Sequence, residues 1–115
     1  FYMEVNGEKH YPVLSLYEQA QTFWKQIISQ HDGETIAIVA HNGINRCLIS
    51  SAIAIPPKLY HSIQQSNCCL NVLNFKGDWG EPVELESLNQ TAHLGIPLPS
   101  PRQNKGLRLL LVRHG

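Results

Sequence analysis

The pattern of apolar and polar residues changes its period most clearly between residues 35 and 52. Thr35–Ala40 is an almost wholly apolar run rich in β-branched side chains, which is typical of a strand buried on both faces of a parallel sheet. The next apolar residues follow the spacing of one helix face, at Ile44, Cys47, Leu48, Ser51 and Ala52. The polar tripeptide His41-Asn42-Gly43 stands between the two. We therefore expect a buried strand, a polar turn and a helix, in that order.

The residues before this unit predict another helix. It opens at Ser15, with Glu18 three residues later as in a capping box, and it ends at His31-Asp32-Gly33, where Gly33 suits a left-handed cap. Its apolar residues share one face: Leu16, Ala20, Phe23, Trp24, Ile27 and Ile28. Residues 1–11 are polar, with a turn at Asn6-Gly7, and predict a loop or a short hairpin.

The residues after this unit predict a hairpin and then a linker. Pro56 or Pro57 stops the second helix or opens a short third one through Lys58–Ile63. Strands at Cys68–Phe75 and Val83–Leu88 flank a glycine-bearing loop. Prolines and polar residues then mark 96–106 as a linker, and Leu107–Val112 begins a new buried strand. We expect one unit over 1–95, the linker, and the start of a second unit over 107–115.

Charge and cysteine content narrow the classes of function. Lys plus Arg equals Asp plus Glu, at nine each in 115 residues, so no overall charge favours nucleic acid or an acidic membrane surface. Three cysteines without a C-x-x-C pair predict neither a disulfide framework nor a zinc site. Apolar runs are too short to span a bilayer, and no leader pattern precedes them. We expect a reducing, cytoplasmic setting with no nucleic acid and no membrane as partners.

The turn at His41-Asn42-Gly43 is the first candidate site. Ligands of open α/β sheets bind beyond the carboxyl ends of the strands, and a helix N-terminus there offers unpaired N–H groups to an anion. Gly43 would let the backbone approach a ligand, and His41 would exchange a proton with it near neutral pH. A purely structural role, with His41 as a cap and Gly43 as a turn residue, explains this stretch equally well.

A second apolar run ends in the same way. Leu107–Val112 leads into Arg113-His114-Gly115, so each predicted strand ends in a histidine and a glycine. A neutral imidazole is a good phosphoryl acceptor, and an arginine grips phosphate oxygens in bidentate fashion. Two imidazoles and an arginine around one phosphate form a workable pocket for phosphoryl transfer.

These residues resemble the histidine phosphatase superfamily, the phosphoglycerate mutase-like proteins. Leu109-Leu-Leu-Val-Arg113-His114-Gly115 is similar to the family's opening motif, and Ile38-Val-Ala-His41-Asn-Gly43-Ile-Asn-Arg46 to its second histidine motif. Asn67 and Leu88–Leu94 resemble its closing segments. The resemblance implies an α/β three-layer sandwich with a mostly parallel central sheet.

The resemblance also implies roles for these residues. His114 matches the nucleophile that takes the phosphoryl group, with Arg113 beside it binding phosphate. His41 matches the histidine across the pocket, and the backbone of Asn42 and Gly43 supplies N–H donors. No metal or organic cofactor is implied, and the partner is a small phosphorylated metabolite. For Arg46, we favour a structural ion pair over a contact with the substrate. His93 is expected to be structural, and His10, His31 and His61 to be surface or cap residues.

The order of the two motifs departs from the family. There the Arg-His-Gly motif comes first, whereas here His41 precedes His114. We favour a segment of a longer protein with two such domains in tandem over a circular permutation, because the family's middle portion, with its acidic general acid, is missing. His41 and His114 would then serve different sites, and the isolated segment would be inactive. Alternatively, Leu107–Val112 folds back into the vacant place in the sheet, or the unpaired edge associates with a second copy.

Three classes of function remain open on the sequence. The first is a phosphatase or phosphomutase segment, in which the phosphoryl group passes to water or back to the substrate. The second is a catalytically dead relative that binds a phosphorylated metabolite or a protein partner. The third is an unrelated α/β module in which the histidines are caps. The paired motifs favour the first, and phosphatase is the simpler assignment.

Overall fold

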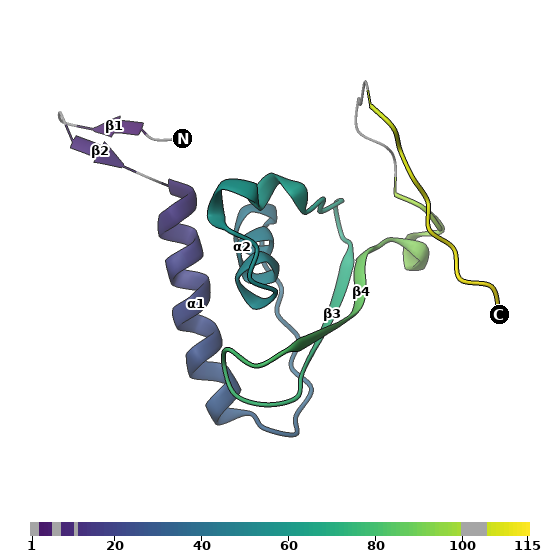
Figure 1. Cartoon of the computed structure of the whole chain (residues 1–115), viewed down its shortest axis with the longest axis horizontal. Helices are drawn as coiled ribbons and strands as arrows, with labels where there is room; N and C mark the ends of the chain where they lie inside the picture. Colours follow the sequence, from purple (N-terminus) through teal and green to yellow (C-terminus); the bar gives the residue numbers. More distant parts are fainter. Residues whose placement is uncertain (1–2, 6–7, 11, 100–105) are drawn as a thin grey trace.

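Two helices and a β-hairpin form the body of the chain (Figure 1). The computed structural model describes residues 3–5, 8–10, 12–99 and 106–115, with side chains from residue 12 onward. Its elements are, in chain order, β1 (Met3–Val5), β2 (Glu8–His10), α1 (Pro12–Gln30), α2 (Asn42–Ala52), the 3-10 helix η1 (Pro57–Ser62), β3 (Leu70–Phe75), β4 (Val83–Gln90) and the 3-10 turn η2 (Ala92–Leu94). None of the described helices is both long and apolar enough to cross a bilayer.

Helix α1 begins earlier than its capping-box pattern predicts. It starts at Pro12, since proline has no N–H to lose and its fixed φ suits the first helical position. Ser15 therefore lies inside the first turn, and the prediction of a start there is wrong. Gly33 adopts a left-handed φ of 75°, as expected for the residue that stops a helix. At the N-terminus, β1 and β2 form a short hairpin, which is one of the two structures predicted for residues 1–11. The predicted turn at Asn6-Gly7 lies outside the described residues.

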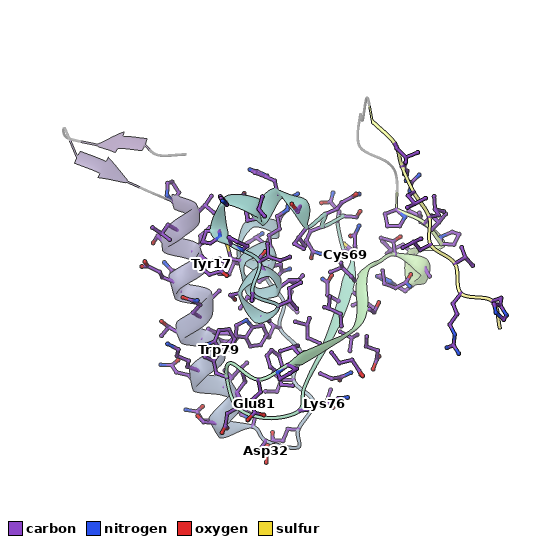
Figure 2. The ribbon with its side chains drawn as sticks, viewed as in Figure 1. Tyr17, Asp32, Cys69, Lys76, Trp79 and Glu81 are labelled. Atoms are coloured by element: carbon purple, nitrogen blue, oxygen red, sulfur yellow. The ribbon has the colours of Figure 1, made fainter. Side chains whose placement is uncertain are left out.

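The core lies where α1 packs against α2. Its buried residues are Tyr17, Ala20, Trp24, Cys47 and Leu48. The Trp24 indole N–H donates to the Leu48 carbonyl at 2.8 Å, and its ring lies 4.7 Å from that of Phe75 in β3, centroid to centroid. The Tyr17 hydroxyl donates to the Ile55 carbonyl at 2.7 Å, fixing the chain that leaves α2. Figure 2 shows Tyr17 on the side of α1 that faces α2. The predicted apolar face of the first helix is thereby confirmed.

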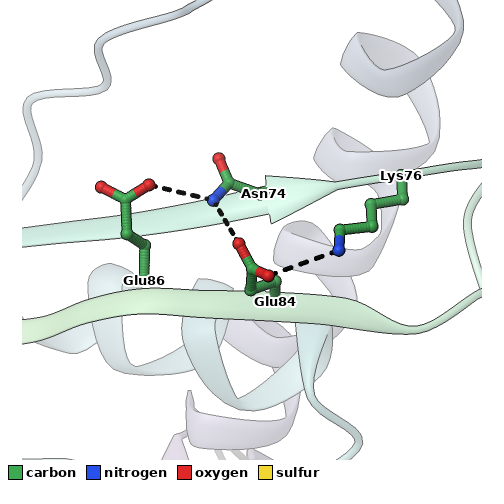
Figure 3. A network of polar contacts seen from close by, with 4 residues as sticks. All are labelled: Asn74, Lys76, Glu84 and Glu86. Atoms are coloured by element: carbon green, nitrogen blue, oxygen red, sulfur yellow. Dashed lines mark hydrogen bonds and ion pairs between the residues drawn. The ribbon is translucent and has the colours of Figure 1, made fainter.

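The hairpin closes one side of this core. Strands β3 and β4 pair antiparallel, with Leu73 opposite Leu85 and Phe75 opposite Val83, so the predicted hairpin is confirmed, although β3 begins two residues later and β4 ends two residues later than predicted. On its outer side, the Asn74 amide donates to the carboxylates of Glu84 and Glu86, and Lys76 pairs with Glu84 at 3.3 Å (Figure 3). The short helix after Pro56 is also present, as η1 with Pro57 in its first position.

The predicted strand over Thr35–Ala40 is not a strand in the structure. The segment is irregular and exposed, and the side chain of Val39 is 98% exposed. A strand needs a neighbour for its backbone N–H and C=O groups, and no described segment forms a ladder with this one. An apolar run cannot supply its own partner, so the prediction of burial on both faces is wrong here.

The same holds for the last residues. Leu107–Val112 has no regular structure. Its four leucines and Val112 are between 51% and 89% exposed. Both described sheets are two-stranded and antiparallel, so the described part of the chain is a small α/β unit without a parallel ladder. The predicted linker falls partly outside the described residues.

Candidate active site

The N-terminus of α2 holds the first group of predicted site residues. His41 is the N-cap, with extended backbone angles of φ −85° and ψ 167°, and its side chain makes no capping hydrogen bond. The first intrahelical bond runs from the Asn45 N–H to the His41 carbonyl at 3.0 Å. The N–H groups of residues 42–44 therefore precede the helical ladder and point out of the helix end. Such a helix end, beside an exposed imidazole, suits an anion.

The sequence predicts two possible roles for Gly43, close approach of the backbone to a ligand or a purely structural role in the turn. It lies within the helix and is not among the glycines with positive φ. A methyl group at its Cα would meet only Leu16 Cδ1, at an ordinary contact distance of 3.7 Å. Neither backbone conformation nor packing requires glycine here, so the alternative in which Gly43 is needed as a turn residue is wrong. The remaining physical role for the missing side chain is access to the helix end.

Asn42 links the helix end to the segment that follows η1. Its side-chain amide donates to the Gln65 carbonyl at 3.4 Å. Gln65 is itself buried, and its amide pairs with that of Asn71 in β3, with distances of 2.9 and 2.8 Å in the two directions. The helix N-terminus and the start of the hairpin are thus held together by neutral amide groups.

Arg46 is buried against η1 instead of forming the predicted ion pair. It is 5% exposed, and its Nη1 donates to His61 Nδ1 at 3.2 Å, with the guanidinium 5.5 Å from the centre of the Tyr60 ring. Its Nε has no partner within the described residues. No carboxylate among the described side chains pairs with it. The ion-pair prediction is therefore wrong, because an imidazole and an aromatic face take the place of an acid.

The second group of predicted site residues lies elsewhere. Arg113 and His114 are exposed in the terminal segment, the yellow end of the chain in Figure 1, and no interaction joins them to His41. The structure therefore brings His41, Asn42 and Gly43 together and does not add Arg113 or His114 to them. This arrangement is compatible with the two groups belonging to different sites.

Two of the other described histidines, His93 and His31, contact a backbone carbonyl and a carboxylate, whereas His61 accepts from Arg46. His93 Nε2 lies 2.8 Å from the Cys68 carbonyl, which ties η2 to the start of the hairpin and fits the predicted structural role. His31 Nδ1 lies 3.3 Å from Glu34 after the end of α1, and His61 is exposed. No group of three His, Cys, Asp or Glu side chains in the described part of the chain is placed to hold a metal ion.

A second polar surface was not singled out from the sequence as a site. A shallow groove runs between residues 64–67 and residues 91–99, next to the Asn42–Gln65 contact. The signal in the sequence is the run of amide and hydroxyl side chains Gln64-Gln65-Ser66-Asn67.

Comparison with known proteins gives a family and two relatives. The profile of the histidine phosphatase superfamily (branch 1) matches residues 4–89. The chain is 36% identical over 110 residues to a probable 2-carboxy-D-arabinitol-1-phosphatase of Arabidopsis thaliana and equally similar to a 2-carboxy-D-arabinitol-1-phosphatase of Triticum aestivum. Each alignment covers 92% of this chain but only 23% and 22% of the respective relative, so the chain spans less than a quarter of their length. No solved structure matches it.

Proposed function

Since the chain belongs to the histidine phosphatase superfamily (branch 1), we propose that it is part of a phosphatase that cleaves small phosphate monoesters through a phosphohistidine. The relatives are named as phosphatases, which supports hydrolysis over the mutase reaction. The observation that carries the proposal is the end of α2, where an exposed imidazole lies beside backbone N–H groups outside the helical ladder.

The proposed chemistry assigns one role to each residue. The neutral imidazole of His114 attacks phosphorus, the bond to the ester oxygen breaks, and water then attacks the phosphohistidine to release inorganic phosphate. Arg113 binds the non-bridging oxygens and compensates their charge. In the site of the preceding domain, His41 and the N–H groups of Asn42 and Gly43 stabilise the phosphoryl group in transfer. None of these steps requires a metal or an organic cofactor.

We further propose that these residues serve two sites in a tandem protein. Residues 1–95 would be the second half of one domain, 96–106 the linker, and 107–115 the first strand and Arg-His-Gly motif of the next. The terminal segment lies apart from α2 in Figure 1, and the chain covers only a small fraction of each relative; both support this arrangement. The isolated segment would then be inactive.

The same proposal accounts for the exposed apolar segments. In the full-length protein, Thr35–Ala40 would lie in the mostly parallel central sheet of a three-layer sandwich, with helices on both faces. Its high exposure in this chain supports the proposal that the strands it would pair with belong to the rest of the full-length protein. The three cysteines are free thiols, which suits a reducing compartment such as the cytoplasm.

Trapping of the phosphoenzyme tests this function. The full-length protein is mixed with a labelled small phosphate monoester and quenched, and acid-labile phosphohistidine is measured. The variant His114→Ala is expected to lose the label of the second domain, because the attacking nitrogen is gone. The variant His31→Ala is the matched control, since the His31 side chain is only partly buried and its ring contacts the Glu34 carboxylate. Full labelling of the His114 variant at both sites would refute the assignment.

A further inference from the structure

Arg46 is a buried cation inside the helix that carries the candidate site. Its side chain is 5% exposed, and it is the one charged residue in the sequence of α2. A guanidinium stays protonated in proteins, and burying a charge without a counter-ion is costly. An apolar side chain of similar volume often serves stability as well or better at such a position. The presence of a charge there therefore calls for a reason other than packing.

The contacts of Arg46 hold its charge in place without neutralising it. Nη1 donates to His61 Nδ1 at 3.2 Å, and because an arginine only donates, this ring nitrogen accepts through the lone pair of a neutral imidazole. The guanidinium lies 5.5 Å from the centre of the Tyr60 ring, whose π face attracts a cation but carries no charge. Nε is buried and has no hydrogen-bond partner within the described structure. The positive charge is thus fixed against η1 and remains uncompensated there.

The acidic residues of the chain lie elsewhere. Of the nine, only Glu4 and Glu8 have side chains outside the described part of the chain, and residues 100–105 contain no acid. Glu4 and Glu8 belong to β1 and β2, which Figure 1 shows beyond the start of α1 and apart from α2. None of the described carboxylates forms an ion pair with Arg46.

Arg46 lies one helical turn from the end of α2 that carries His41. It is four residues after Asn42 and three after Gly43, so it shares their side of the helix. At a rise of about 1.5 Å per residue, Asn42 is roughly 6 Å away along the axis. The helix dipole favours cations at the other end, so the dipole does not explain an arginine at this position. The charge instead adds to the positive potential of the N–H groups that precede the helical ladder.

We propose that Arg46 is an electrostatic residue of the candidate site, which attracts the phosphoryl group through space. This role rests on the proposed function and adds one full charge to the partial charges at the end of α2. Because the guanidinium is buried, salt screens it less than it screens a surface cation. Because it acts without contact, its effect depends on the charge of the bound anion and not on the anion's shape.

The test compares two anions of the same shape and different charge. Methylphosphonate above its second ionisation is a dianion, and methanesulfonate is a monoanion. Binding of each to the full-length protein is followed by the NMR signals of the His41 imidazole, so no turnover is needed. In Arg46→Met we expect about a tenfold loss of affinity for the dianion and about a threefold loss for the monoanion, because the attraction scales with the charge of the anion.

Three further variants separate charge from packing. Arg46→Gln removes the charge but keeps an amide donor for His61, and it is expected to behave as Arg46→Met does. Arg46→Lys keeps the charge and is expected to retain most of the affinity for both anions. Lys58→Met removes an exposed cation of η1 and is expected to change neither affinity by more than about twofold, since solvent screens that charge.

The outcomes also distinguish this role from the proposed function. Equal losses for the two anions in the neutral variants, no loss, or no binding to the unmodified protein would overturn the role of Arg46. A loss in Arg46→Lys as large as in Arg46→Met, or failure of both neutral variants to fold, would overturn it as well. Charge-dependent losses in a protein that forms no phosphohistidine would support the role and refute the phosphatase activity. Phosphohistidine formation with charge-independent losses would do the reverse.

Discussion

At the scale of single residues, His41 and Gly43 illustrate what the sequence could and could not predict. The position of His41 at a helix N-terminus followed from the change of period after Ala40, and it is confirmed. The role of Gly43 did not follow, because a glycine signals freedom of the backbone without saying whether the fold uses it. Arg46 was placed on the helix correctly, but its partner depends on η1, fifteen residues away, which no local pattern reveals.

Gly43→Ala separates the two roles of this glycine. We expect the free energy of unfolding to rise by about 0.5–1 kcal/mol, because alanine loses less backbone entropy in a helix and its methyl group finds room. Chemical denaturation of the chain measures it. In the full-length protein we expect phosphate monoester hydrolysis to fall, since the methyl group narrows access to the N–H groups. A lower stability would show that the turn does require glycine.

Cys47 predicts how stability changes in alkaline solution. It is fully buried, and burial raises the pKa of its thiol above the ordinary value. The unfolded chain then loses this proton at a lower pH than the folded chain. The contribution is therefore fully present below the ordinary thiol pKa of about 8.5 and is lost as pH rises through the folded value.

The free energy of unfolding is measured between about pH 8 and 10, the range in which thiols and phenols lose their protons. We expect a decrease with pH that is smaller in Cys47→Ala and unchanged in Cys68→Ala, whose thiol is exposed. Burial also raises the pKa of Tyr17, so a residual decrease at the upper end of the range is expected in both variants. An identical slope in all three proteins would contradict the assignment to Cys47.

At the scale of elements, local signals were sufficient wherever an element finds its partner nearby in the sequence. The hairpin of β3 and β4 was predictable because the turn between them fixes their pairing. Helix α1 was predictable from its apolar face, although its start was set by Pro12 and not by the pattern at Ser15. Thr35–Ala40 was predicted wrongly because a strand of a parallel sheet depends on a partner that is distant in sequence.

On the outer side of the hairpin, the carboxyl group of Glu84 has a lowered pKa. Hydrogen bonds from Asn74 and Lys76, together with the charge of Lys76, hold the pKa of the Glu84 carboxyl below its ordinary value (Figure 3). Its contribution to stability is present above the ordinary carboxyl pKa and is lost as pH falls through the lowered value. We expect Asn74→Ala to move the carboxyl signal of Glu84 to a higher pH in an NMR titration. Lys25→Ala, on the exposed side of α1, is the control.

At the scale of the whole molecule, the chain is more extended than its length requires. Its radius of gyration is 16.0 Å, whereas a compact domain of this length has about 13 Å. Composition and charge are those of an ordinary globular domain, so nothing in them predicts this. The parts that extend away from the body are the β1–β2 hairpin at one end and the terminal segment at the other (Figure 1).

Self-association of the isolated chain should follow from the exposed apolar segments Thr35–Ala40 and Leu107–Val112. Unpaired apolar edges recruit strands from other copies, so we expect the sedimentation coefficient to rise with concentration. Val39→Lys should reduce this, because Val39 is 98% exposed and a charge opposes pairing of edges. Leu14→Lys, at a 43% exposed position of α1, should have less effect. A chain that remains monomeric at all concentrations would contradict the expectation.

Trp24 gives the body of the chain a built-in optical probe. The indole lies in α1, bonds to a carbonyl of α2 and touches an aromatic ring of β3, so it reports on all three at once. Separation of any one of them would bring water to the ring and shift its fluorescence to longer wavelength. Substitution of Trp79 by phenylalanine would leave Trp24 as the sole tryptophan in the fluorescence spectrum of the isolated chain. The integrity of the core could then be followed in every variant without an assay of activity.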